Sequence, residues 1–184
     1  MSPPVRGFAL TGAARACATP GGAYANCLAL SAGYTAWLRA RGVPAGILVA
    51  RGSRVAFPTA AGRWPDCDPE DYAHWVTFTG DHCVDWTRRQ FQPDADWPAV
   101  LPVDALGGAW RDVTVWACEN CPELVADPLH LELAPADLHR EHRAIARETG
   151  GSGPFPDPRH DADAVPLSPM CRCTAAVRTS TAAG

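Results

Sequence analysis

The sequence predicts an α+β fold in which one amphipathic helix packs against a small antiparallel sheet. The helix is expected at residues 27–41, where apolar side chains recur three and four positions apart and where Gly42 and then Pro44 supply a stop signal. Two short segments of strand-like pattern, HWVTF and HCVDW, flank Gly80 and Asp81, which is typical of a β-hairpin. These segments together define the expected core.

Further segments extend this core. AGILVARG, at residues 45–52, is a short apolar run between turn residues and predicts a buried strand, and RDVTVWACENC, at residues 111–121, predicts another. The Pro-, Gly- and Asp-rich residues 53–72 and the proline-rich residues 92–110 are expected to be surface loops, the first long enough to be functional. A solvent-facing helix is expected at residues 135–149, which begin with Pro-Ala-Asp.

Length and composition indicate how the chain is organised. It has 184 residues, 47% of them apolar, which suits one domain with an appended lobe. Residues 1–22 are rich in Gly, Pro and Ala and are expected to be an irregular lead-in, with a short helical turn near TGAARACA. Residues 23–112 are expected to hold the core, and residues 113–184 a cysteine-bearing C-terminal extension that is partly flexible.

Charge and hydropathy argue against several classes of function. The formal net charge is −4, the pI is about 5.8, and the arginines are scattered among acidic residues, so the clustered basic surface of a nucleic-acid binder is missing. The N-terminus lacks the apolar core of a signal peptide, and no segment approaches the roughly 18 apolar residues of a membrane span. We therefore expect no nucleic-acid or membrane partner, and a cytoplasmic protein or one delivered without a signal peptide.

One cysteine, one histidine and one aspartate are candidates for a catalytic triad. Cys27 stands at the start of the expected helix, where backbone N–H groups and the helix dipole favour a thiolate. With Gly80 and Asp81 as central turn residues, His74 shares a face of the hairpin with Asp85 and lies diagonal to it, about 7–8 Å away between α-carbons. In such a triad a thiolate attacks, an imidazole transfers the proton and a carboxylate fixes the imidazole tautomer. The alternative interpretation is a buried structural thiol, a core histidine and a turn aspartate.

These residues resemble the papain-like and transglutaminase-like superfamily of cysteine enzymes. The resemblance rests on an Asn-Cys pair at a helix start, a helix ending in LRARGVPA, a strand, a loop, and then HWV followed by VDWTRRQF, over about residues 20–100. Within this superfamily, the sequence most resembles the branch of small bacterial toxins and deamidases. The resemblance implies a papain-like core with the nucleophile helix packed on an antiparallel sheet, and Cys27, His74 and Asp85 as nucleophile, general base and orienting carboxylate.

The resemblance implies cysteine-dependent acyl chemistry on an amide. Peptide hydrolysis, glutamine deamidation and transamidation share one thioester intermediate, and the sequence does not separate them. We expect a deamidase or protease, acting on a protein or peptide substrate and requiring no cofactor for catalysis. Residues 1–26 lack the Gln that papain-type proteases use in the oxyanion hole, so the Cys27 N–H and the Asn26 side chain are candidates for that role. Trp75 is a candidate for lining a substrate groove, with core packing as the alternative. Gln90 is a candidate for orienting the substrate, with simple solvent contact as the alternative.

A second group of cysteines lies apart from the triad. They form two motifs, a Cys-x-x-Cys (Cys118 and Cys121) and a Cys-x-Cys (Cys171 and Cys173). Together these motifs would place four thiolates around a structural zinc ion, which would hold the C-terminal tail to the rest of the domain. Four histidines are alternative ligands, namely His130, His139, His142 and His160. Reduced thiols and disulfides are the other interpretations, and the missing signal peptide favours thiols or metal over disulfides.

The competing functional hypothesis is a protein without catalysis. A catalytically inactive papain-like scaffold, or a zinc-stapled interaction module such as a phage or mobile-element accessory protein, would carry a Cys27 thiol of ordinary reactivity. A disulfide-rich exported protein is the third possibility. The reactivity of Cys27, and its dependence on His74, discriminates the enzyme from the inactive protein.

Overall fold

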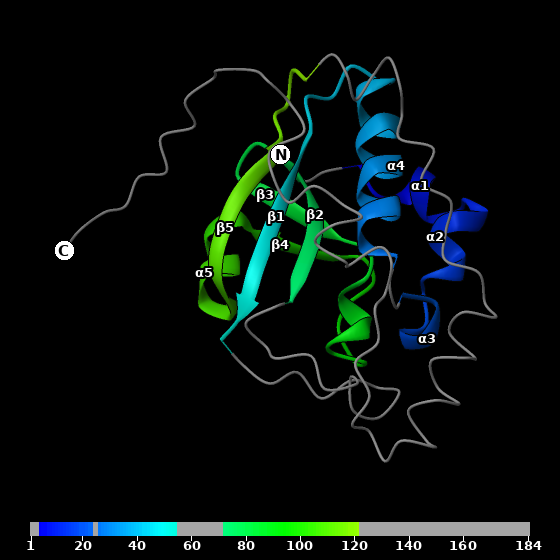
Figure 1. The fold of residues 1–184 in the computed structure, drawn as a ribbon. Coiled ribbons are helices and arrows are strands. Elements are labelled where there is room, and N and C mark those ends of the chain that lie inside the picture. The colour runs from blue at the N-terminus through cyan, green and yellow to red at the C-terminus, as the bar shows by residue number, and fades with distance from the viewer. Residues whose placement is uncertain (1–3, 24–25, 55–71, 122–184) are drawn as a thin grey trace.

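The computed structural model describes residues 4–23, 26–54 and 72–121, and these form an α+β fold (Figure 1). One five-stranded antiparallel sheet has the strand order β4-β3-β2-β1-β5. The strands are β1 (Gly46–Ser53), β2 (Ala73–Thr79), β3 (His82–Asp85), β4 (Ala99–Pro102) and β5 (Trp110–Ala117). Helix α4 (Cys27–Arg39) packs on one face of this sheet. The α+β class and the antiparallel sheet are therefore confirmed.

Both faces of the central strands β1 and β2 are buried over most of their length. Strand alternation sends Val49 and Trp75 to the face beneath α4, and Leu48 and Val76 to the opposite face, which the short helix α5 (Leu106–Ala109) covers. A strand that is covered on both faces needs apolar residues at successive positions. This requirement explains why AGILVARG is a continuous apolar run.

Hydrogen bonds made by buried polar side chains hold α4 against β2. Ser31 Oγ donates to the carbonyl oxygen of Trp75 at 2.9 Å, and Thr77 Oγ1 donates to the carbonyl oxygen of Ser31 at 2.9 Å. Thr77 Oγ1 also lies 3.0 Å from Thr35 Oγ1. These bonds fix the position of α4 along β2, and with it the position of Cys27, the first residue of the helix.

The hairpin of β2 and β3 has the register expected from the sequence. Thr79 pairs with His82 and Phe78 with Cys83, and Gly80 lies in the turn between them at φ 57°. This left-handed conformation is the one that a two-residue hairpin turn requires and that glycine adopts without strain. A slip of one residue would move every side chain of a strand to the other face. The turn therefore determines which residues of the two strands share a face.

Three other expected elements are present with small shifts in their ends. The helix expected at residues 27–41 begins at Cys27 and ends at Arg39. Strands β1 and β5 cover most of the segments expected at residues 45–52 and 111–121.

The N-terminal segment is more regular than its composition suggests. It contains three short helices, α1 (Arg6–Ala9), α2 (Gly12–Ala16) and α3 (Pro20–Ala23). Helix α2 coincides with the helical turn expected near TGAARACA, and Thr11 Oγ1 caps it by accepting from the Ala14 N–H at 3.2 Å. Phe8 packs its ring against Tyr34 of α4. The expectation of an irregular lead-in was wrong because tertiary packing, which local composition does not reveal, stabilises such short helices.

The segment expected to be a surface loop at residues 92–110 contains regular structure, so that expectation was also wrong. Strand β4 pairs with β3, and a 3-10 helix, η3 (Val103–Ala105), leads from it into α5. Pro102 is compatible with a strand here because β4 is an edge strand and Pro102 ends it. The boundary expected between residues 112 and 113 falls inside β5, so the sheet continues through residue 117.

Several expectations lie outside the described residues. They concern residues 55–71 of the first loop, the helix at residues 135–149, Cys171, Cys173 and the flexible part of the tail. Among residues 4–23, 26–54 and 72–121, every helix falls short of the length and apolar character that a membrane crossing needs.

Replacing Thr77 by Val is expected to lower the free energy of unfolding by about 1–3 kcal/mol. The isosteric side chain would leave the buried oxygens of Ser31 and Thr35 without their contacts to Thr77. Urea unfolding followed by circular dichroism measures the change. Thr114→Val, on an exposed position of β5, is the control and should leave the stability unchanged. Equal stability of the two variants would contradict this account of how α4 is fastened.

Candidate functional site

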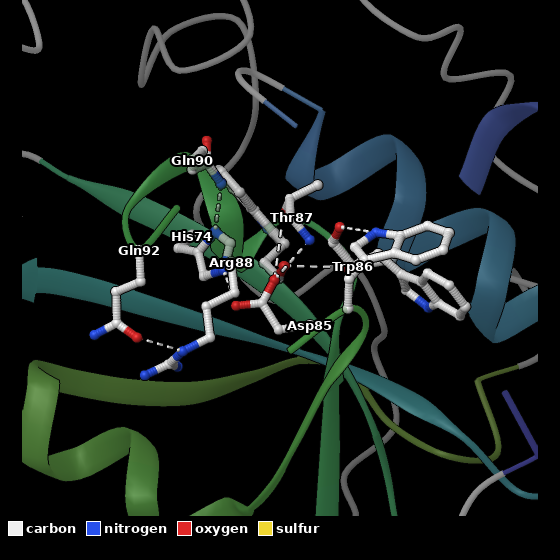
Figure 2. A network of polar contacts seen from close by, with 10 residues as sticks. His74, Asp85, Trp86, Thr87, Arg88, Gln90 and Gln92 are labelled. Atoms are coloured by element: carbon white, nitrogen blue, oxygen red, sulfur yellow. Dashed lines mark hydrogen bonds and ion pairs between the residues drawn. The ribbon is translucent and has the colours of Figure 1, made fainter. Parts of the chain in front are cut away.

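Two adjacent strands bring His74 and Asp85 together (Figure 2). His74 is the second residue of β2 and Asp85 is the last residue of β3. Nε2 of His74 lies 2.8 Å from Oδ2 of Asp85, and the two side chains are only 1% and 2% exposed. The diagonal relation on one face of the hairpin, predicted from the turn residues, is confirmed.

The turn after β3 holds the Asp85 carboxylate. Oδ1 accepts a hydrogen bond from the Thr87 N–H at 2.9 Å and lies 3.3 Å from Thr87 Oγ1, which is an Asx-turn arrangement. Burial alone would raise the pKa of Asp85, but the charge and hydrogen bond of His74, followed by the Thr87 N–H and the charge of Arg88, hold that pKa below its usual value. The buried carboxylate is therefore ionised.

The imidazole of His74 is stabilised in its protonated form. Burial alone would lower its pKa, but the charge and hydrogen bond of Asp85, together with the hydrogen bond and charge of Cys27, raise the pKa to about 10. Nε2 is engaged by Asp85. Nδ1 is therefore the ring nitrogen available to exchange a proton with Cys27.

Cys27 reaches this pair from the N-terminal end of α4. It belongs to the same core cluster as Ala73 and Trp75 at the start of β2, and a hydrogen bond joins it to His74, the residue between them. The structure thus brings the three predicted residues into one series, from thiol to imidazole to carboxylate. A helix N-terminus and an adjacent imidazolium both favour the thiolate form of a cysteine.

Two aromatic rings enclose the imidazole of His74. Trp110, the first residue of β5, stacks on it with 5.7 Å between ring centroids and an interplanar angle of 15°. Phe91 meets it edge to face at 4.9 Å and 88°. These rings fix the orientation of the imidazole, and the face of an indole attracts a cation. The enclosure therefore suits a charged His74.

The three further candidates occupy different places. Asn26 is buried, and its Nδ2 donates to the carbonyl oxygen of Gly22 at 2.8 Å. Trp75 lies in the core under α4 beside Cys27, on the face of β2 opposite to His74. Gln90 is buried next to the triad, and its Nε2 lies 3.4 Å from His74 Nδ1. Of the three, Gln90 contacts the triad histidine.

The Cys-x-x-Cys segment lies just after β5. Cys118 and Cys121 are buried, and the Cys121 N–H donates to the Cys118 carbonyl oxygen at 3.1 Å to close the turn. Arg39 donates to the carbonyl oxygens of both cysteines and of Ala45, which ties this turn to the end of α4. Within the described part of the chain, no group of three or more His, Cys, Asp or Glu side chains is placed to hold a metal ion. The expected partners Cys171 and Cys173 lie outside it.

Two other thiols lie near the triad. Cys17 and Cys83 are buried. Burial, and secondarily the charge of Cys27, raises the pKa of Cys17 to about 12, while burial and then the charge of Asp85 raise the pKa of Cys83 to about 12. Protonated thiols of this kind are poor nucleophiles. They serve as internal references for the reactivity of Cys27.

Sequence reasoning missed Thr87, Phe91 and Trp110. The spacing in DWT does carry a signal, because an aspartate followed two residues later by a backbone N–H donor is the pattern of an Asx-turn. No comparable signal marks Phe91 and Trp110, since their contacts with His74 depend on how separate segments of the chain pack around β2. Comparison with protein-family models, curated proteins and solved structures gives no match.

Asp85→Asn is expected to lower the pKa of His74 by about 1–3 pH units, because burial then acts without the opposing negative charge. In the wild type the imidazolium should persist at neutral and mildly alkaline pH, since its pKa is about 10. Imidazole ¹⁵N chemical shifts followed against pH measure both values. A wild-type His74 that titrates near its ordinary pKa, or an unchanged pKa in the variant, would contradict this description of the pair.

Proposed function

We propose that this protein is a cysteine-dependent enzyme that performs acyl transfer or hydrolysis on an amide. The observation that carries the proposal is the buried His74–Asp85 pair with Cys27 hydrogen-bonded to the same imidazole. Each of the three groups has the chemistry that one role in a thiol triad requires. The thiol gives its proton to the imidazole, and the carboxylate stabilises the imidazolium that forms.

The proposed reaction proceeds in two halves. The Cys27 thiolate attacks the carbonyl carbon of an amide, and the negative charge develops on the carbonyl oxygen near the N-terminal end of α4, where the Cys27 N–H and the Asn26 side chain are candidate donors. His74 then delivers the Nδ1 proton to the leaving nitrogen, which leaves a thioester on Cys27. Water or an amine, deprotonated by His74, attacks the thioester and releases the acyl group. Asp85 keeps the imidazole oriented and stabilises its charged form throughout.

We further propose that the fold is a papain-like or transglutaminase-like core. Support comes from the order of the parts, with the thiol at the start of the helix, the imidazole on the next-but-one strand and the carboxylate on the strand paired with it. Within this proposal the substrate is a protein or peptide, deamidation or proteolysis is the reaction, and catalysis needs no cofactor.

The pH dependence of Cys27 alkylation tests the proposed function. Iodoacetamide is used with peptide mass spectrometry to locate the modified cysteine. Since the Cys27 side chain is buried, the shape of the pH profile is the readout rather than the absolute rate. The alkylation rate of Cys27 should already be at its plateau well below pH ~8.5, which is the pKa of an ordinary thiol. Cys17 and Cys83 should react only at much higher pH, because their pKa values are raised.

His74→Ala should return the Cys27 profile to that of an ordinary thiol. His82→Ala is the matched control, because His82 pairs with the exposed Asp81 at the other end of the hairpin and should leave the profile unchanged. A wild-type Cys27 whose rate follows an ordinary thiol and ignores the His74 substitution would refute the enzyme proposal. With the thiolate established, ammonia release from glutamine peptides and cleavage of peptide bonds separate a deamidase from a protease.

A further inference from the structure

Gln90 presents a buried amide to the Nδ1 side of the His74 ring, the side that also faces Cys27. It is the last residue of the 3-10 helix η2 (Arg88–Gln90) and is 2% exposed. Its Nε2 lies 3.4 Å from His74 Nδ1, as Figure 2 shows. Its Oε1 is buried and has no hydrogen-bond partner among the described residues. A buried, unsatisfied carbonyl oxygen beside an ionisable ring is costly unless a donor is brought to it.

The two charge states of His74 need opposite ends of this amide. Asp85 accepts from Nε2 in both states, so the charge of the ring depends on whether Nδ1 carries a proton. A neutral ring has a lone pair at Nδ1 and accepts from an amide N–H. A protonated ring donates from Nδ1, and the amide nitrogen cannot accept that hydrogen bond, whereas the amide oxygen can.

A half-turn of the amide satisfies both groups at once. The nitrogen and oxygen of a glutamine side chain have nearly the same shape, so the rotation exchanges them without moving the rest of the residue. With Oε1 on Nδ1, the buried oxygen gains a donor, and the imidazolium gains a second acceptor beside the Cys27 sulfur. The other groups that face the ring are Asp85 from β3 and Cys27 from α4, while Arg88 of η2 acts on Asp85. The facing positions on the remaining neighbours, Ala50 of β1 and Trp110 of β5, are uncharged.

We propose that Gln90 is a positioning residue for His74, whose amide offers Oε1 to the protonated ring and Nε2 to the neutral ring as the proton moves between Cys27 and His74. The proposal deepens the proposed function and rests on it. Because the hydrogen bond from a charged donor is the stronger of the two, Gln90 favours the imidazolium overall. The imidazole then keeps one orientation in both halves of the reaction.

Two substitutions separate the acceptor role from simple space filling. Gln90→Met removes both hydrogen-bonding ends and should lower the pKa of His74 by about 1–2 pH units, measured by imidazole ¹⁵N shifts in the protein without substrate. Gln90→Glu keeps an oxygen at the site and should not lower that pKa. Gln92→Met, at an exposed position in contact with Arg88 rather than with the ring, is the matched control and should leave the His74 pKa unchanged.

The opposite results overturn the proposal. A rise of the His74 pKa in Gln90→Met would mean that Gln90 only donates from Nε2, and an unchanged pKa would mean that it only fills space. Should the Met variant fail to fold, the wild type decides the question, because the side-chain amide resonances of Gln90 should shift as His74 titrates while those of Gln92 do not. Constant Gln90 resonances would reject the proposal. Since these titrations need no substrate, a protein that titrates as described but processes no amide would refute the proposed function alone.

Discussion

The hydrogen-bonded pair of His74 and Asp85 is the interaction on which the rest of the site depends. Two ionisable groups lose their hydration when they are buried, and the loss is tolerated only when they pair and their remaining polar atoms are satisfied. Thr87 supplies the second contact to the carboxylate, and the aromatic rings of Phe91 and Trp110 close around the imidazole. Removing one member of such a pair typically costs about 3–5 kcal/mol, so the pair constrains the fold as well as the chemistry.

The pair in turn depends on two geometric constraints in the sheet and the helix. The turn at Gly80 fixes the hairpin register, without which His74 and Asp85 would not share a face. The bonds from Ser31 and Thr35 to β2 fix how far along the strand α4 begins, and therefore where the Cys27 sulfur lies. A reactive thiol needs both constraints, because the proton transfer between sulfur and imidazole tolerates little error in their separation.

The sequence was most informative where the structure is local. The hairpin of β2 and β3 could be predicted because Gly80 and Asp81 set its register within a few residues, and the diagonal pairing of His74 with Asp85 followed from strand alternation. The aromatic enclosure could not be predicted, since Trp110 belongs to a strand that joins the sheet beside β1, far from the hairpin in the sequence. Strand β4 was missed because an edge strand needs only one apolar face and tolerates the prolines that suggested a loop. Of the short N-terminal helices only α2 was expected, and α1 was missed because its stability comes from contacts such as that of Phe8 with Tyr34.

The central claim is that Cys27, His74 and Asp85 form one charged unit in the resting protein, and thiolate absorbance in the ultraviolet tests it most directly. The difference spectrum between the wild type and Cys27→Ser isolates this one cysteine from the others, and it is recorded from acidic to alkaline pH. The account predicts a thiolate band at neutral pH that disappears on acidification. A difference spectrum without that band until strongly alkaline pH would contradict the account, because Cys27 would then be an ordinary buried thiol beside a structural ion pair.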